Sequence, residues 1–305
     1  MKKNVVCLLV FWGLLGSVSS ACADNGLTRI SEHVYAYVDT KGSSPANSFG
    51  ANAGIIIGER GLAVVDTLIS ARQARKFLED IRAVTDKPIL YVINTHYHLD
   101  HVFGNSVFVA QGATVISHAL CLAEMQAKGP GTLASSADFG LSPEEMAGTG
   151  LAYPTITFSQ DLQLELGNLR VDLVRPAPSH SKGSILVCVN REQVVFAGDV
   201  LFAGYHPYLA DGDLEGWVTT LDYLSSLATD KIIPGHGPLS GHEELNAMKG
   251  YLVAFDAKAR KLAAAGASLE EAAGQIKSAM PARAEGEWLI QANLKAKYLV
   301  ASPPH

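Results

Sequence analysis

The alternation of apolar and polar positions predicts several short strands in the first half of the chain. Three are expected at Val34–Val38, Ala53–Ile57 and Leu62–Asp66, and glycines at both ends of the segment 58–61 indicate a turn between the last two. The uninterrupted apolar run Ile89–Ile93 is typical of a strand that is buried on both faces. This half therefore predicts a sheet with a buried central strand.

A second group of strands and two amphipathic helices complete the pattern. After Ser70 apolar residues recur at helical spacing through Ile81, and a second helix, capped by Asp213, carries Trp217 and Leu224 on one face. The second group of strands is predicted at Leu162–Leu166, Leu169–Val174, Ser184–Val189 and Val194–Ala197. Strands followed by a helix thus occur twice, which favours an α/β fold with two sheets packed between helices.

The segment between the two halves and the end of the chain have different patterns. Residues 128–154 are rich in Gly, Ser, Thr and Ala, with a short helix expected at Ser142–Glu145, and we interpret them as an insertion or a lid over a site. After Gly237 the pattern is helical, with capping-box starts at Ser240 and Ser268. This tail is expected to pack on the outside of the sandwich.

The first 23 residues have the pattern of a secretory signal peptide. Two lysines precede an apolar run from Val5 to Leu15, and cleavage is expected after Ala23. The run is shorter than the roughly 20 residues that cross a bilayer. A lipid anchor through Cys22 is the alternative, but Ser19 stands where such signals usually carry an aliphatic residue. The protein is therefore expected in the periplasm or secreted.

Charge and cysteine content narrow the class of partner. Loss of residues 1–23 removes two lysines and no acid, so 22 basic and 30 acidic residues remain and the net charge is −8. Nucleic-acid binding is disfavoured because phosphates need a basic surface. No segment of the mature chain is apolar enough to span a membrane, and the sequence does not decide the oligomeric state. It also leaves open whether Cys121 and Cys188 pair or are buried separately.

The strongest chemical signal follows the buried strand, in the segment Thr95–His101. It contains four potential metal ligands, which are His96, His98, Asp100 and His101. On an extended chain the first three share one face, and His101 points towards a neighbouring position. Imidazole and carboxylate are ligands of metals such as Zn²⁺, and packing offers no other reason for this cluster. Further candidates, each beside small residues, are His180, Asp199 and His236.

The order His-x-His-x-Asp-His, His, Gly-Asp and Pro-Gly-His-Gly resembles the metallo-β-lactamase superfamily over nearly the whole mature chain. Asp66, at the end of Val64-Val65-Asp66-Thr67, matches the first motif of the family, an acid that supports the ligand loop. The resemblance implies a four-layer αββα sandwich. We expect a single domain at 24–305 with a helical C-terminal extension at about 240–305.

The resemblance also implies how the ligands divide between two divalent ions. His96, His98 and His180 hold one ion, Asp100, His101 and His236 hold the other, and Asp199 bridges them. Zn²⁺ is the first expectation, with Fe and Mn as alternatives. A hydroxide shared by the two ions would be the nucleophile, and Asp100 would act as general acid or base.

Residues near these motifs are candidates for contacts with a small-molecule substrate. Tyr205, His206 and Tyr208 follow Asp199 in a loop, and Lys182 follows His180 by two positions. We expect at least one of the loop residues to line the site, because active-site loops carry such side chains on a rigid scaffold. An ordinary loop aromatic and an exposed lysine are the alternatives.

Local motifs leave the substrate open within the superfamily. Asp211–Trp217 resembles class B1 β-lactamases, but those enzymes typically have arginine in place of His101, cysteine in place of Asp199 and lysine in place of Phe202. The ligand set is similar to that of hydroxyacylglutathione hydrolases, lactonases and phosphodiesterases, and the exported metallohydrolases of quinoprotein dehydrogenase systems look similar too. We expect hydrolysis of an ester, lactone, thioester or β-lactam-like amide.

Two other functions compete with hydrolysis. One is a persulfide dioxygenase. Such enzymes use this fold with a single iron and typically leave some ligands of the second site unused. The complete set of ligands argues against it. The other is an accessory metalloprotein of a periplasmic dehydrogenase system. An intact set that includes Asp199 argues against an inactive protein.

Overall fold

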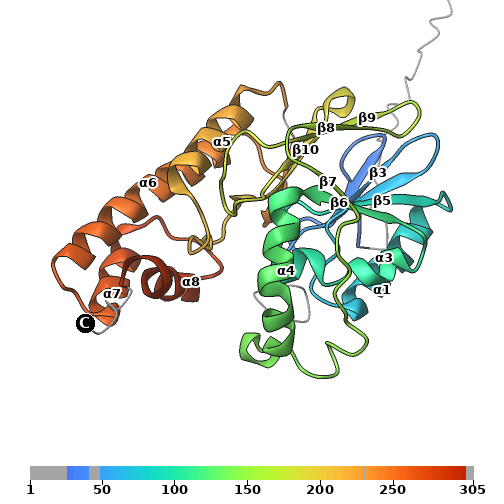
Figure 1. The fold of residues 1–305 in the computed structure, drawn as a ribbon. Helices are drawn as coiled ribbons and strands as arrows, with labels where there is room; N and C mark the ends of the chain where they lie inside the picture. The colour runs from blue at the N-terminus through green and yellow to red at the C-terminus, as the bar shows by residue number, and fades with distance from the viewer. Residues whose placement is uncertain (1–25, 41–48, 230, 300–305) are drawn as a thin grey trace, which may run out of the picture.

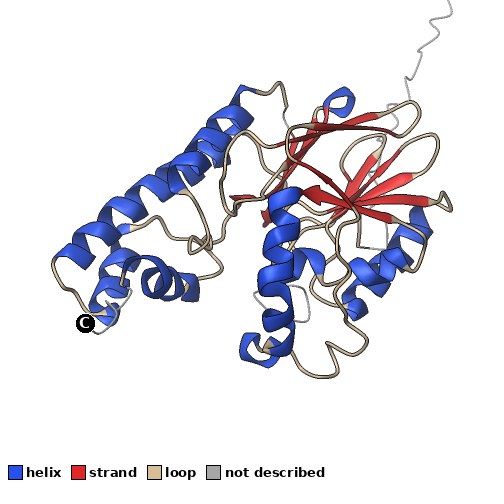
Figure 2. Ribbon diagram, in the orientation of Figure 1, coloured by secondary structure: helices blue, strands red, loops and turns tan. Residues whose placement is uncertain are grey.

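The computed structural model describes residues 26–40, 49–229 and 231–299, and in them two β-sheets pack between helices. One sheet has seven strands in the order β1-β2-β3-β4-β5-β6-β7, and the other has five in the order β12-β11-β10-β9-β8. Figure 2 shows both sheets in red at the right of the view, with blue helices on their outer sides. In Figure 1, α5 to α8 lie together at the left, apart from α1 and α3 at the lower right.

The first sheet and its helices use residues up to 158. Its strands are β1 (Thr28–Arg29), β2 (Val34–Ala36), β3 (Gly54–Ile57), β4 (Leu62–Val65), β5 (Ile89–Ile93), β6 (Thr114–His118) and β7 (Ile156–Phe158). The helices of this half are α1 (Ala71–Val84), α2 (Leu99–Val102), α3 (Asn105–Val109) and α4 (Ala119–Ala134). Strands β4 to β7 are parallel, and the earlier pairs are antiparallel.

The second sheet and the remaining helices follow. Its strands are β8 (Leu162–Glu165), β9 (Arg170–Val174), β10 (Leu186–Val189), β11 (Val194–Phe202) and β12 (Lys231–His236). The helices are α5 (Leu214–Ser226), α6 (His242–Ala264), α7 (Leu269–Ala279) and α8 (Trp288–Asn293), followed by a π-helical turn at Leu294–Tyr298. Among the described residues, β11–β12 is the only parallel pair of this sheet.

Three apolar clusters hold the layers together. Ile56, Val65 and Ile93 of the first sheet pack against Val187 and Phe196 of the second. A second cluster joins the outer face of the first sheet to α1 and α3, and a third joins the outer face of the second sheet to α5, α6 and α7. Apolar faces of sheets and helices leave water in this arrangement, which is the main stabilising term. The predicted four-layer αββα sandwich is confirmed.

Several local predictions match the structure because they rest on short-range contacts. The hydroxyl of Ser70 accepts from the backbone N–H of Gln73 at the start of α1, and Asp213 caps α5 in the same way. The capping box at Ser268 is present at the start of α7. The one predicted at Ser240 is wrong: Gly241 is the N-cap of α6, and Ser240 forms a β-bridge with Ile232.

The segment expected to be an insertion or lid is partly regular structure. Helix α4 continues to Ala134, past Pro130, so the first seven residues of the segment are helical. Leu133, near the end of α4, packs against the apolar cluster that contains Tyr97 and Met125, which supports the helical path of these residues. The short helix expected at Ser142–Glu145 is only a series of turns. One capping hydrogen bond forms there, but no further turn of helix follows.

Parallel strand pairs bring the motif residues to one edge of the sandwich. Asp66 and the segment that starts at Thr95 follow the carboxyl ends of β4 and β5, while His236 ends β12. In β11 the register shifts around Gly198, whose φ is +49°. A Cβ at Gly198 would lie 2.6 Å from the Thr95 hydroxyl, so glycine allows the two sheets to meet beside Asp199.

Three expectations concern the compartment and the cysteines. The predicted signal peptide at residues 1–23, with Cys22 and Ala23, lies outside the described residues. The helices of the described ranges include none with the length and apolar character of a membrane span. Cys121 and Cys188 are both buried and free, in different apolar clusters, so they do not pair.

Candidate metal centre

The seven residues chosen as ligands from the sequence lie together around the Asp199 carboxylate. Its Oδ1 is 3.1 Å from His101 Nε2 and 3.4 Å from His236 Nε2, and its Oδ2 is 3.3 Å from His180 Nε2. His96 Nε2 is 3.7 Å from the same Oδ2. All of these side chains are buried or nearly so. Asp199 therefore lies between two sets of histidines.

The two sets correspond to the two predicted metal positions. In one, ligand atoms of His96, His98, His180 and Asp199 all lie within 4.8 Å of one another, and in the other, those of Asp100, His101 and His236 do. Asp100 Oδ2 is 3.5 Å from His236 Nε2. We name the position beside His96, His98 and His180 the first metal site, and the position beside Asp100, His101 and His236 the second.

One geometric expectation for this segment is wrong. The chain was expected to be extended from His96 to Asp100, but it turns into α2 at Leu99. The helical turn moves Asp100 away from His96 and His98 and places its carboxylate 3.8 Å from His101 Nε2. The N–H of His101 bonds to the carbonyl of His98, which fixes this turn. Two successive residues thereby reach the second site.

Each histidine donates a hydrogen bond outwards from one ring nitrogen. The Nδ1 atoms of His101, His180 and His236 face Asp66 Oδ2 at 2.8 Å, the Tyr208 carbonyl at 3.1 Å and the Phe49 carbonyl at 3.3 Å. Because these oxygens only accept, the other ring nitrogen of each neutral imidazole presents a lone pair to the centre. Thr95 has the same effect on His96, since its hydroxyl donates to Asp66 and accepts from His96 Nδ1.

His98 has the opposite orientation, with Nε2 outwards. It lies 3.1 Å from Asp211 Oδ2, so Nδ1 carries the lone pair and lies 2.8 Å from His180 Nε2. Asp211 also accepts from Tyr97 and from Lys128 Nζ. The sequence analysis missed this role of Asp211. Its place in the motif shared with B1 enzymes was a signal, but the contact depends on how the loop folds back.

The unpartnered atoms of the cluster fit a bound cation. His96 Nε2, His101 Nε2 and Asp199 Oδ1 are buried and make no hydrogen bond of good geometry, although the last two atoms lie 3.1 Å apart. Two lone pairs that face each other at 2.8 Å, as in His98 and His180, repel unless a positive charge lies between them. The donor set of imidazole and carboxylate suits Zn²⁺, Fe²⁺ or Mn²⁺. The residues present thus fit two divalent ions.

The pKa values in the cluster agree with this charge requirement. Burial lowers the pKa of His180 to about 3 and that of His96 well below its usual value, so both are neutral ligands at neutral pH. Burial also lowers the pKa of His101, but the carboxylates of Asp199, Asp100 and Asp66 outweigh it and raise that pKa above its usual value. A metal ion at Nε2 supplies the positive charge in place of a proton.

The substrate-contact candidates do not all reach the centre. Tyr208 does, because its ring centroid is 5.5 Å from that of His98, and Tyr205 lies 5.6 Å from the ring of His236. Lys182 remains exposed. His206 is not brought to the centre: it is 5% exposed and its Nδ1 lies 2.7 Å from the Tyr251 hydroxyl on α6. Its backbone N–H also bonds to the carbonyl of Glu285, so His206 is held against the C-terminal segment.

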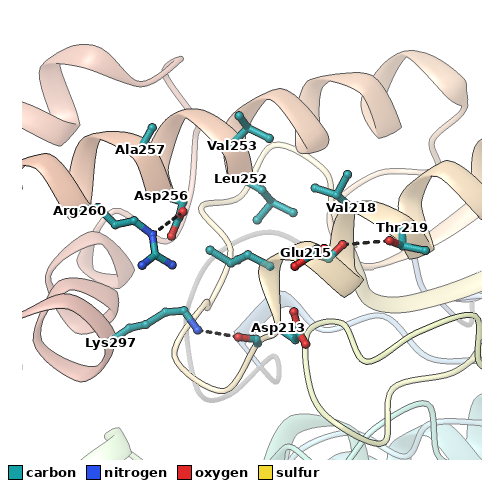
Figure 3. A pocket seen from close by; sticks show the side chains of 12 residues that line it. Asp213, Glu215, Val218, Thr219, Leu252, Val253, Asp256, Ala257, Arg260 and Lys297 are labelled. Atoms are coloured by element: carbon teal, nitrogen blue, oxygen red, sulfur yellow. Dashed lines mark hydrogen bonds and ion pairs between the residues drawn. The ribbon is translucent and has the colours of Figure 1, made fainter.

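A cavity of about 730 Å³ lies between α5, α6 and the C-terminal turn. Figure 3 shows its walls, with Val218, Leu252 and Val253 on the apolar side and Arg260 and Lys297 on the charged side. None of the candidate ligands lines it. Gly212, the neighbour of Asp211 in the chain, is one of its lining residues.

A close backbone approach allows a local test of the cluster. A Cβ at Gly235 would lie 1.9 Å from Asp199 Oδ1, and backbone atoms of Gly198 and Asp199 are within 3 Å. Gly235→Ala is therefore expected to displace Asp199 and weaken metal binding at least tenfold, a loss comparable to that of an outer-shell contact. Metal titration of the variant measures this. Gly150→Ala is the control, since nothing lies within 4 Å of that position. Unchanged binding in Gly235→Ala would contradict this placement of Asp199.

An αββα sandwich with a buried histidine and aspartate cluster at its strand ends defines a class of metal-binding proteins. Residues 47–236 match the family model of the metallo-beta-lactamase superfamily. The chain belongs to this superfamily. The matched range ends at the last candidate ligand, so the helices that follow lie outside it.

Curated relatives include hydrolases of different substrates. The chain is 29% identical over 218 residues to a linear primary-alkylsulfatase of a Pseudomonas species, covering 61% of this chain but only 41% of that protein. It is 24% identical to a type 2 metallo-beta-lactamase of Bacteroides fragilis, over 72% of this chain and 82% of the relative. An acyl-coenzyme A thioesterase of Homo sapiens is 26% identical, over 64% and 76%.

A solved structure supports the fold. The metallo-beta-lactamase from Pontibacter korlensis superposes with a TM-score of 0.60 at 19% identity, covering 74% of this chain and 98% of that one. At this identity the match concerns the fold alone.

Proposed function

We propose that the protein is an exported hydrolase with two metal ions that cleaves an ester, lactone, thioester or β-lactam-like amide. The observation that carries the proposal is the inward direction of five imidazole lone pairs around one buried carboxylate. This set is the one that two divalent ions need, and a metal-free cluster would leave the lone pairs in mutual repulsion. Support for export comes from the sequence of residues 1–23 alone.

The proposed ligand assignment follows the two groups of contacts. His96, His98 and His180 hold the first ion, Asp100, His101 and His236 hold the second, and Asp199 lies between them. Zn²⁺ is the preferred ion, with Fe²⁺ and Mn²⁺ as alternatives. When bound, the two ions supply a hydroxide nucleophile at neutral pH and polarise the oxygen of the scissile bond.

The side chains of this chain supply the remaining functions. Asp100 places its carboxylate at the second site, 3.5 Å from His236 Nε2, and we assign it the transfer of a proton to the leaving group. Phe202 stacks on the ring of His236 with centroids 4.9 Å apart, and Trp217 packs edge-on against His180. These rings exclude water behind the ligands. They keep the electrostatic interactions in a medium of low dielectric constant.

The preference among substrates rests on a lysine that is replaced in this chain. Phe202 takes the place of the lysine that binds the carboxylate of β-lactams in B1 enzymes, so this anchor is missing. The relatives that hydrolyse a sulfate ester or a thioester show that the fold accepts other leaving groups. We therefore favour esters, thioesters and lactones over β-lactams as substrates.

A hydrolysis panel tests the function. The mature protein, loaded with Zn²⁺, is assayed with an acylglutathione, a lactone, an aryl ester, an aryl phosphate and nitrocefin. We expect kcat/KM for at least one of the ester, thioester or lactone substrates to exceed that for nitrocefin by about a hundredfold, equivalent to roughly 2.7 kcal/mol in transition-state binding. Chelation should abolish the activity and Zn²⁺ should restore it. A fully loaded protein that hydrolyses none of the compounds would refute the proposal.

A further inference from the structure

The segment 202–212, which starts at the last residue of β11 and leads towards α5, contacts both metal positions from outside, and we call it the loop 202–212. Tyr208 accepts the hydrogen bond of His180 Nδ1 on its carbonyl, and Asp211 accepts that of His98 Nε2. Phe202, at the start of the loop, stacks on His236. Two of the three histidines of the first metal site therefore depend on this loop for their orientation.

Three polar side chains of the C-terminal extension bind the backbone of the same loop: Arg283, Asn293 and Lys297. Arg283 donates through Nη1 to the carbonyls of Phe202 and Tyr205, at 2.9 and 3.1 Å. Lys297, labelled in Figure 3, donates to the carbonyl of Gly212 at 2.6 Å. These contacts lie at the beginning and the end of the loop. In the part of the chain that the structure describes, Lys297 has no carboxylate as an ion-pair partner.

The middle of the loop is held by Asn293, at the end of α8. Its Oδ1 accepts from the N–H of Leu209 at 2.7 Å, and its Nδ2 donates to the carbonyl of Pro207 at 2.8 Å. Only 1% of Asn293 is exposed. The two bonds flank Tyr208, so the amide fixes the peptide whose carbonyl orients His180. A buried polar residue among apolar helices is costly unless both of its groups are bonded, as they are here.

We infer that the C-terminal extension is a positioning element of the first metal site, and that Asn293 is its central residue. The inference rests on the proposed metal centre. The extension lies beyond the residues that match the family model, so it adds this support to the shared site. The extension acts through the loop. Asn293 fixes the backbone on both sides of Tyr208, and the Tyr208 carbonyl fixes the tautomer of His180. Lys297 binds the backbone carbonyl next to Asp211. Loss of such outer contacts typically weakens metal binding 10- to 100-fold.

The test compares the two metal sites in Asn293 variants of the full-length mature protein. Asn293→Leu removes both bonds and keeps the branching of the side chain, whereas Asn293→Asp keeps an acceptor for Leu209 and, when ionised, has no donor for Pro207. Competition with a chromophoric chelator gives the affinity for each Zn²⁺ equivalent, and Co²⁺ spectra identify the site. We expect Asn293→Leu to weaken the first site about tenfold, Asn293→Asp to weaken it less, and both to spare the second site.

A control and two outcomes decide the inference. Lys277→Gln changes an exposed ion pair of the same extension and should leave both affinities unchanged. Wild-type affinity at the first site in Asn293→Leu would overturn the inference, and so would equal weakening of both sites. If Asn293→Leu does not fold, Asn293→Asp and Lys297→Met carry the test on the same criterion. A wild-type protein that binds no metal would instead refute the proposed function.

Discussion

Replacing Asp199 by alanine is expected to remove the carboxylate that the two metal sites share. Metal content and the rate of hydrolysis should fall together. The carboxylate lies within 3.4 Å of nitrogens from His101, His180 and His236, so its loss leaves the lone pairs of both sets without a shared negative charge. Burial raises the pKa of Asp199, but His236 and the other histidines outweigh burial and lower it, which keeps the group ionised. We expect kcat to fall by more than the roughly 10- to 100-fold cost of losing an outer contact.

Metal analysis and kinetics on the same Asp199→Ala preparation measure both effects. Asp138→Ala, at an exposed position in the segment near α4, is the matched control and should keep metal and activity. A variant that retains two bound ions and wild-type kcat would show that Asp199 does not bridge them.

Asp66→Ala is expected to destabilise both the fold and the second metal site. Asp66 is 2% exposed and accepts from the N–H and hydroxyl of Thr95 and from His101 Nδ1. Burial raises its pKa, and the hydrogen bonds from His101 and Thr95 oppose that shift. Removal leaves three buried donors unpaired, so the free energy of unfolding should fall by about 3 to 5 kcal/mol, the usual cost of breaking a buried ionic pair.

Asp66→Asn separates the two consequences. Asparagine tolerates the positive φ of this position, +59°, and keeps one acceptor for Thr95, so most of the stability should remain. Its amide has only one oxygen, so it cannot accept from both Thr95 and His101 as the carboxylate does. The second site should therefore bind metal more weakly than in the wild type. Denaturant unfolding and Zn²⁺ titration measure the two effects. An Asp66→Ala protein with wild-type stability would contradict the role given to this residue.

Local signals predicted much of the fold and the ligand set. The strand at Ile89–Ile93 has the predicted bounds, because an apolar run of this length between a proline and a polar motif has one favourable packing. The helices that begin after Ser70 and Asp213 follow from capping and periodicity alone. Histidine and aspartate spacing selected four of the seven residues that the structure brings together. The small residues beside His180, Asp199 and His236, together with the family resemblance, selected the other three.

The remaining features depend on contacts between distant parts of the chain. The turn of α2 at Leu99 moves Asp100 to the second site, and a spacing argument cannot supply it. The direction of His206 depends on Tyr251, 45 residues further on. Asn293 carries no motif, and its role becomes visible only when α8 lies against the loop 202–212. Short-range patterns contain no information on such pairs.

Metal analysis of the purified mature protein tests the central claim most directly. With hydrolytic activity measured on the same sample, we expect about two metal equivalents per chain, both needed for activity, as a paired site requires. A single tightly held iron, together with oxygen consumption on a persulfide and no hydrolysis, would contradict it.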